Sequence, residues 1–229
     1  MTEYAVAPPA QPTVEIQGTN ARFPVRRIFC VGRNYADHAR EMGNDPDRDP
    51  PFFFTKPADS IVPHGASIPF PVATTNLHHE AELTIAISTA GAAIAAADAL
   101  THVFGYAASN DLTRRDLQNE AKAARRPWDM SKGFDNSAVI GAIAPVSVIG
   151  HPAHAALTAH VGDDLRQSSD IDQMIWPVAD IIAYLSNLVT LQPGDLIMTG
   201  TPAGVGQILP GQTCTVAIAG IGTASVTVG

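Results

Sequence analysis

Short apolar runs separated by glycine, proline and polar residues dominate the pattern along the chain. Runs of this kind, bounded by turn-forming residues, are typical of β-strands. They predict strands at residues 26–32, 52–55, 77–87, 104–112, 139–141, 146–149, 157–161, 164–167, 196–199, 214–218 and 225–228. Gly162 and Asp163 would form the turn of a hairpin between the seventh and eighth of these strands.

Helical spacing of apolar residues is confined to four segments, at residues 34–42, 98–103, 113–124 and 177–191. The first would begin at Asn34 as its N-cap and end at Gly43. The last has proline in its first turn and an apolar stripe on one face. Many short strands and few helices, without an internal repeat, predict a β-rich α+β fold in a single domain.

Proline positions suggest where this domain begins. Pro8, Pro9 and Pro12 predict a loosely ordered arm that can touch a neighbouring molecule. We therefore assign residues 1–24 to an N-terminal arm and lead-in, and residues 25–229 to the compact domain. The polar, proline-containing segment 44–51 is either a lid that moves on Gly43 or an ordinary surface loop.

Composition and charge restrict the class of partner. The chain has 229 residues, of which 45% are hydrophobic, and its mean hydropathy of +0.07 excludes a disordered chain. Its net charge of −8, from 22 acidic and 14 basic residues, argues against nucleic acid as a partner. A small anionic substrate stays compatible with this charge, because a bound metal and a few basic side chains can invert the local field.

Several absences bear on the compartment. The most apolar stretch, residues 83–100, is interrupted by Ser88 and Asp98, so no membrane span is expected. Cys30 and Cys214 lie far apart in apolar contexts, which predicts buried free thiols. Since the first residues also do not resemble a signal peptide, we expect a cytoplasmic protein.

Two glutamates in a strand-like segment are the first candidates for chemistry. Glu80 and Glu82 are two residues apart and would point to the same face of the strand. Asp111, at the polar end of another apolar strand, is a third candidate ligand. Carboxylate ligands select Mg²⁺, Mn²⁺ or Ca²⁺ rather than zinc. The alternative is a solvated strand edge. We expect His78 and His79 to pack or hydrogen-bond rather than bind metal.

A base and its orienting acid are the second candidates. His38 and Glu41 are three residues apart on a predicted helix, where the carboxylate can hold the imidazole in one tautomer for general-base catalysis. An ordinary surface pair would have the same spacing. Lys132 has a simpler interpretation as a solvated lysine. The glycine-rich segment 199–206, which contains Thr201, has a simpler interpretation as a tight structural loop. That segment lacks the lysine of a Walker A loop.

Five motifs taken in order, however, resemble the successive signatures of the fumarylacetoacetate hydrolase (FAH) family. They are VGRNYADH at residues 31–38, HEAEL at 79–83, NDLTRRDLQ at 110–118, SKGFD at 131–135 and TGTPAGVG at 199–206. The resemblance runs from about residue 26 to the C-terminus. It implies an FAH-type mixed β-sandwich roll, usually a homodimer, with bound Mg²⁺ or Mn²⁺.

The resemblance also implies roles for residues in these motifs. The metal ligands fall on Glu80, Glu82 and Asp111. The catalytic residues fall on His38, Glu41 and Lys132. The substrate-binding residues are Arg33, Tyr35, Arg115, Gln118 and Thr201.

The activity implied by the resemblance is metal-dependent cleavage of a C–C bond in an acylpyruvate, a small anionic 2-oxo acid. In this family we expect fumarylpyruvate to yield fumarate and pyruvate during gentisate-type aromatic breakdown. The second carboxylate of such a substrate needs a cation, for which Arg33, Arg125 and Arg126 are candidates, unless they are solvated surface residues. Alternatives within the family are oxaloacetate decarboxylation and hydroxydienedioate isomerisation. A metal-stabilised binding protein without turnover is the alternative from another class.

Overall fold

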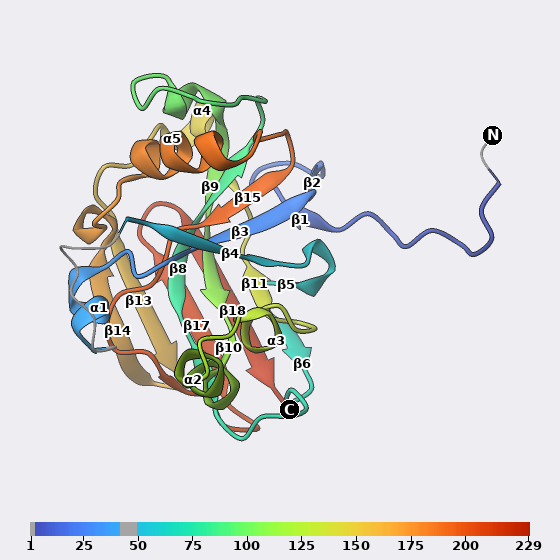
Figure 1. Cartoon of the computed structure of the whole chain (residues 1–229), viewed down its shortest axis with the longest axis vertical. Coiled ribbons are helices and arrows are strands. Elements are labelled where there is room, and N and C mark those ends of the chain that lie inside the picture. Colours follow the sequence, from blue (N-terminus) through green and yellow to red (C-terminus); the bar gives the residue numbers. More distant parts are fainter. Residues whose placement is uncertain (1–2, 42–49) are drawn as a thin grey trace.

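Two β-sheets pack face to face in the computed structural model, which describes residues 3–41 and 50–229 (Figure 1). The larger sheet has the strand order β4 (Phe52–Lys56), β3 (Arg27–Gly32), β15 (Asp195–Met198), β8 (Ala81–Ile87), β9 (Val103–Asp111), β11 (Ala138–Ile140) and β5 (Ile61–Pro63), with β12 (Ala144–Pro145) beside β9. The smaller has the order β14 (Asp164–Asp170), β13 (Ala156–Val161), β17 (Thr213–Ile218), β18 (Gly222–Val228) and β6 (Ala66–Ile68).

Shorter elements surround the two sheets. A three-stranded sheet contains β10 (Thr113–Arg114), β7 (Leu77–His79) and β16 (Gly206–Gln207), and β1 (Thr13–Glu15) pairs with β2 (Arg22–Pro24). The α-helices are α1 (Ala36–Glu41), α2 (Arg115–Ala123), α3 (Asp129–Lys132), α4 (Val146–Ile149) and α5 (Val178–Leu188). The 3-10 helices are η1 (Ala58–Ser60), η2 (Ala99–His102) and η3 (Ile171–Gln173).

The core lies on both faces of the larger sheet. All seven residues of β8 are buried, with the odd-numbered side chains in one apolar cluster and Ala86 in a second. Leu83 and Ile85 pack in the cluster that includes residues of β13, β17 and α5, whereas Ala86 packs in the cluster that includes Val14 and Phe23. This two-sided burial explains why β8 is apolar except for Glu82 and Thr84. The predicted β-rich, single-domain α+β fold is confirmed.

The N-terminal residues and the cysteines are in the predicted environments. Residues 3–10 are exposed and leave the body as an extended arm (Figure 1). Cys30 and Cys214 are buried free thiols, as predicted. Among the described residues, none of the helices has the length and apolar character that a membrane crossing requires. The proposed lid at residues 44–51 lies almost entirely outside the described residues, as does the predicted end of the first helix at Gly43.

Two predicted strands are wrong in ways that matter for the fold. Residues 146–149 form the helical turn α4, which lies between extended Pro145 and Gly150, whose φ is +69°. The predicted strand 77–87 is two strands, because β7 pairs with β10 and β16 while β8 pairs with β9 and β15. The interruption falls at Glu80, whose backbone N–H donates to Asn110 Oδ1 at 2.9 Å.

The helices also differ from their predicted bounds. Asn34 does not cap the first helix: its side chain is buried and bonds to backbone groups of Trp176 and Thr199, and the helix begins at Ala36. The helix predicted at residues 113–124 begins after the short strand β10, and that at 98–103 is 3-10. The helix predicted to reach residue 191 ends at Leu188, because Val189 is extended.

Candidate active site

One pocket gathers most of the predicted site residues. Its walls include residues of β8, of the loop after β15, and of helices α1, α2 and α3. The lining residues are Val31, Gly32, Arg33, His38, Phe54, Glu80, Glu82, Arg115, Gln118, Lys122, Trp128, Lys132 and Thr201. Glu41 and Asp111 contact this set directly. Tyr35 is buried and is not in the lining.

Three buried carboxylates form a cluster at the base of the pocket. Glu80, Glu82 and Asp111 each place an oxygen within 4.8 Å of the others. Antiparallel pairing of β8 with β9 brings Asp111 opposite Glu80, and the Asp111 N–H donates to the Glu80 carbonyl oxygen at 2.9 Å. The sheet register therefore unites residues that are about thirty positions apart in sequence.

Three cations surround this cluster. Lys132 Nζ lies 2.6 Å from Glu80 Oε2 and 2.7 Å from Asp111 Oδ2, and Arg115 Nη2 lies 2.5 Å from Glu80 Oε1. Lys56 Nζ is 2.7 Å from Asp111 Oδ1 and fully buried. Sequence reasoning missed Lys56, although it shares a face of β4 with Phe54, which lines the pocket. The direct contacts of these three cations are all to Glu80 or Asp111.

The electrostatics of the cluster are uneven. Burial raises the pKa of Glu82, and the carboxylates of Asp111 and Glu80 raise it further. Burial acts in the same direction on Glu80, but Lys132 and Arg115 outweigh it and hold the pKa of Glu80 below its usual value. A divalent cation would relieve the repulsion at Glu82. The all-carboxylate donor set fits a hard ion such as Mg²⁺ or Mn²⁺.

The neighbouring histidines lie outside this donor set. His78 Nδ1 accepts a hydrogen bond from Arg115 Nε at 3.2 Å. Burial and the positive charge of Arg115 lower the pKa of His78 to about 4, so the ring is neutral at physiological pH. His79 Nδ1 donates to Gln167 Oε1 at 2.9 Å. Both rings therefore have hydrogen-bonding roles, as the sequence predicts.

The His38–Glu41 pair faces the same pocket. His38 Nδ1 lies 2.9 Å from Glu41 Oε2, and the His38 side chain is buried. The other oxygen, Glu41 Oε1, accepts from the Gly204 N–H at 3.2 Å. The carboxylate therefore favours the tautomer protonated on Nδ1, which leaves Nε2 as the basic nitrogen.

The glycine-rich segment 199–206 orients carboxylates. Its Gly200 N–H donates to Glu82 Oε2 at 2.8 Å, while Gly204 holds Glu41. Gly200 has a φ of +92°, and an added Cβ would lie 2.9 Å from the Cβ of Asn34. Only glycine fits there. The interpretation as a tight structural loop is therefore correct, and the loop also brings Thr201 to the pocket wall.

Only some of the residues predicted to bind substrate lie in the pocket. Arg115 and Gln118 are buried and joined by a hydrogen bond of 2.5 Å from Arg115 Nη1 to Gln118 Oε1. Arg33 lines the pocket with its guanidinium over the Phe52 ring. Arg125 and Arg126 are exposed and lie outside the lining. Of the three arginines considered for a second carboxylate, the structure brings Arg33 alone to the pocket.

Gln167 is a buried residue that the sequence analysis missed. Its Oε1 accepts from His79 Nδ1 and from the Ala81 N–H, at 2.9 and 3.0 Å. Its Nε2 donates to Thr201 Oγ1 and to the Pro202 carbonyl oxygen, both at 2.8 Å. Gln167 therefore ties the His79 ring and the Ala81 backbone, on either side of Glu80, to the loop that carries Thr201. No local motif marks it, since β14 is otherwise largely exposed.

We expect Gln167→Leu to lower the free energy of unfolding by about 2–4 kcal/mol, because two buried donors and two acceptors lose their partner. Gln207→Leu, which removes one exposed bond to the Thr75 carbonyl oxygen, is the matched control and should cost less than about 0.5 kcal/mol. Urea unfolding followed by circular dichroism measures both. Equal stabilities for the two variants would contradict the role of Gln167.

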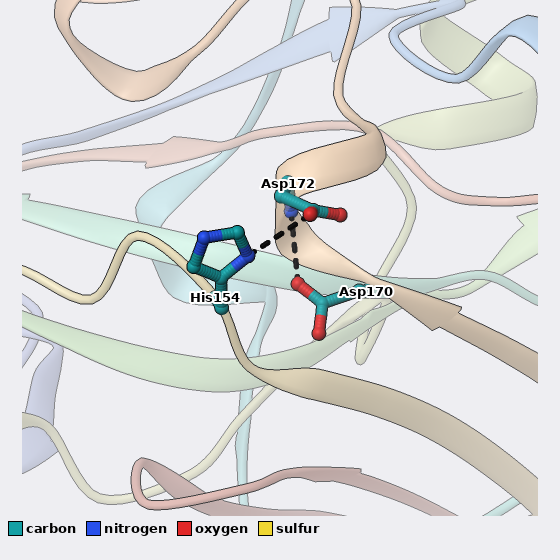
Figure 2. A group of neighbouring side chains, drawn as sticks. All are labelled: His154, Asp170 and Asp172. Carbon is teal, nitrogen blue, oxygen red and sulfur yellow. Dashed lines mark hydrogen bonds and ion pairs between the residues drawn. The ribbon is translucent and has the colours of Figure 1, made fainter.

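A second acidic group lies at the surface. Figure 2 shows His154, Asp170 and Asp172 turned toward one another. Asp170 Oδ1 accepts from the N–H groups of Ala155 and Asp172, and Asp172 Oδ2 is 2.9 Å from His154 Nδ1. Asp170 is the N-cap of η3, so this group has a structural explanation.

Known proteins resemble the whole of this arrangement. Residues 27–229 match the family described as fumarylacetoacetate (FAA) hydrolase C-terminal. The oxaloacetate decarboxylase, mitochondrial, of Dictyostelium discoideum is 41% identical over 199 residues, covering 86% of this chain and 91% of that protein. The oxaloacetate tautomerase FAHD1, mitochondrial, of Mus musculus is 42% identical over 183 residues, covering 80% and 82%. The crystal structure of fumarylpyruvate hydrolase from Pseudomonas aeruginosa, in complex with Mn²⁺ and pyruvate, has a TM-score of 0.96 and 50% identity, covering 99% of each chain.

Proposed function

Because the chain belongs to the fumarylacetoacetate hydrolase family, we propose that it is an enzyme that hydrolyses a C–C bond of an acylpyruvate, with fumarylpyruvate as the substrate. The observation that carries the proposal is the His38–Glu41 pair in the pocket that also contains the carboxylate cluster. Hydrolysis requires activation of water, whereas decarboxylation of a 2-oxo acid does not. The similarity to fumarylpyruvate hydrolase over the whole chain supports the same choice.

Glu80, Glu82 and Asp111 would hold the divalent ion, Mg²⁺ or Mn²⁺, with Ca²⁺ as an alternative. When bound, such an ion supplies positive charge that attracts a 2-oxo acid and stabilises negative charge on its oxygen atoms. The Mn²⁺ and pyruvate named in the Pseudomonas aeruginosa complex agree with this choice of ion and ligand.

His38 performs the proton transfers of the proposed reaction. Its Nε2 takes a proton from water, while Glu41 holds the opposite nitrogen. The resulting hydroxide attacks the carbonyl carbon of the fumaryl group. The C–C bond to the pyruvate fragment then breaks, and its electron pair passes into that fragment as an enolate. A proton returned from His38 to the carbon converts the enolate to pyruvate, so that water and fumarylpyruvate yield fumarate and pyruvate.

Lys132 stabilises the negative charge that develops. Its ammonium lies at the base of the pocket, and the carboxylates of Asp111 and Glu80 outweigh burial and raise its pKa, which keeps it protonated. A protonated amine can donate a hydrogen bond to the enolate oxygen. Arg115, Gln118, Thr201 and Arg33 line the pocket and would contact the substrate, whereas Tyr35, the fifth predicted contact, is buried outside the lining.

The remaining parts of the proposal rest on resemblance to the family. We assign the activity to residues 25–229 and treat residues 1–24 as an arm and lead-in. The homodimer, the role in gentisate-type aromatic breakdown and the cytoplasmic location belong to the same proposal.

Absorbance of the enol form of the substrate provides the test. We expect protein loaded with Mg²⁺ or Mn²⁺ to abolish the ultraviolet absorbance of fumarylpyruvate and, more slowly, of acetylpyruvate, and chelation to stop the reaction. Protein that leaves both compounds intact but releases CO₂ from oxaloacetate would disprove the hydrolase assignment.

Oxaloacetate chemistry is the second candidate, because proteins named oxaloacetate decarboxylase and oxaloacetate tautomerase are 41% and 42% identical to this chain. Decarboxylation forms the same pyruvate enolate, so Lys132 and the carboxylate cluster would serve it equally. Isomerisation of a hydroxydienedioate would show as a spectral shift without cleavage. Absence of turnover with all of these compounds would indicate a binding protein.

A further inference from the structure

Lys122 is a pocket residue that has no role in the proposed chemistry. It lies on α2 at the seventh position after Arg115, with Gln118 between them, and all three line the pocket. Positions i, i+3 and i+7 fall on one face of a helix, so the three side chains form a row along the pocket wall. Arg115 is the member of this row that contacts the carboxylate cluster.

Two cations, Arg33 and Arg115, lie near Lys122. In the part of the chain that the structure describes, its ammonium has neither a hydrogen-bond partner nor a carboxylate partner, unlike those of Lys56 and Lys132. Partial burial lowers the pKa of Lys122, and the guanidinium groups of Arg33 and Arg115 lower it further. A half-buried ammonium without a carboxylate partner among the described residues provides a site for an anion.

The length of this row suits a substrate with a charged group at each end. Seven residues of α-helix advance by about 10 Å. In an extended seven-carbon chain the terminal carbons lie about 7–8 Å apart, given C–C bonds of about 1.5 Å. A lysine side chain is long enough to cover the difference. A 2-oxo acid with its head at the carboxylate cluster would therefore place its far end near Lys122.

We propose that Lys122 binds the carboxylate at the far end of the substrate and makes the pocket selective for 2-oxo acids that carry a second carboxylate. This inference rests on the proposed function for the position of the 2-oxo acid head. It assigns to Lys122 the role for which Arg33, Arg125 and Arg126 are the sequence-based candidates.

Two inert ligands provide a direct test. 2-Oxoheptanedioate and 2-oxoheptanoate share a seven-carbon 2-oxo acid chain and differ in whether it ends in a carboxylate or a methyl group. With the Mn²⁺-loaded protein, calorimetry should give a Kd for the dioate that is about tenfold or more below that for the monoacid, as expected for one charge-assisted hydrogen bond. In Lys122→Met the ratio of the two constants should approach one, and Lys122→Arg should restore most of it.

Arg126→Met is the matched control, since Arg126 is an exposed cation near the same end of α2 and lies outside the pocket lining. It should keep the wild-type ratio. Equal binding of the two ligands by the wild type, or an unchanged ratio in Lys122→Met, would overturn the proposal.

Kinetics separate this inference from the proposed function. If fumarylpyruvate is a substrate, Lys122→Met should lower kcat/KM for fumarylpyruvate relative to that for acetylpyruvate by about tenfold, mainly through KM. If the wild type does not hydrolyse fumarylpyruvate but retains a preference for the dioate that depends on Lys122, the proposed function fails and the inference stands. If it hydrolyses fumarylpyruvate without such a preference, the proposed function stands and the inference fails.

Discussion

His38→Ala should lower kcat for fumarylpyruvate hydrolysis by about 10³-fold or more, near the upper part of the range for loss of a general base. The imidazole is the group in the pocket that is oriented by a carboxylate and left with one basic nitrogen. Affinity for Mn²⁺, measured by calorimetry, should change by less than about threefold, because His38 is not among the three clustered carboxylates.

The control for this variant is on the same helix. Arg40 is exposed and its side chain contacts Asp37, so Arg40→Ala should keep wild-type kinetics. Oxaloacetate decarboxylation, which needs no activated water, should also survive His38→Ala. Retention of more than about one tenth of the hydrolytic rate would show that another group activates water.

Glu82→Gln should weaken Mn²⁺ binding by about 100-fold or more and abolish activity at low metal concentration. Loss of even an outer hydrogen-bond partner commonly costs about 10–100-fold in metal affinity, and Glu82 would be a direct ligand. The glutamine oxygen can still accept from the Gly200 N–H, so the loop should keep its position. Calorimetry with Mn²⁺ and rescue of activity at high Mn²⁺ are the measurements.

Stability distinguishes Glu82 from Glu80. Without metal, Glu82→Gln should leave the protein as stable as the wild type or more stable, because burial and the neighbouring carboxylates raise the pKa of Glu82 and disfavour its charge. Glu80→Ala should also weaken metal binding, but it leaves Lys132 and Arg115 without their shared partner. That loss should cost about 3–5 kcal/mol in urea unfolding with a chelator present. Equal destabilisation by both substitutions would contradict this assignment of charges.

The overall acidity of the chain proved a poor guide to the site. Three of the 22 acidic residues are buried in one cluster, where Lys56, Lys132 and Arg115 contact Glu80 and Asp111. Lys122 and Arg33 are further cations in the lining of the pocket. Net charge averages over a whole surface, whereas a substrate responds to the few groups within about a Debye length of it.

The sequence by itself determined the elements whose signals are local. Alternation and turn residues predict the hairpin at residues 157–167, which in the structure extends over 156–170. The spacing of Glu80 from Glu82 and of His38 from Glu41 predicts side chains that meet. These distances depend on the geometry of a few consecutive residues, although Glu80 itself lies between β7 and β8. The five motifs in their order along the chain indicated the family, since each is a short run that can be read directly from the sequence.

Only the tertiary structure decided how these parts combine. Residues 146–149 are as apolar as a strand, yet they form a helical turn, and no strand pairs with them in the described part of the chain. Residues 77–87 divide at Glu80, because β7 and β8 pair in two different sheets. Asn34, Lys56, Gln167 and Lys122 acquire their roles from partners or pocket walls supplied by other elements, some more than a hundred residues away. A buried polar group is satisfied by whatever the fold brings within about 3 Å, and that proximity depends on long-range pairing which a local pattern does not contain.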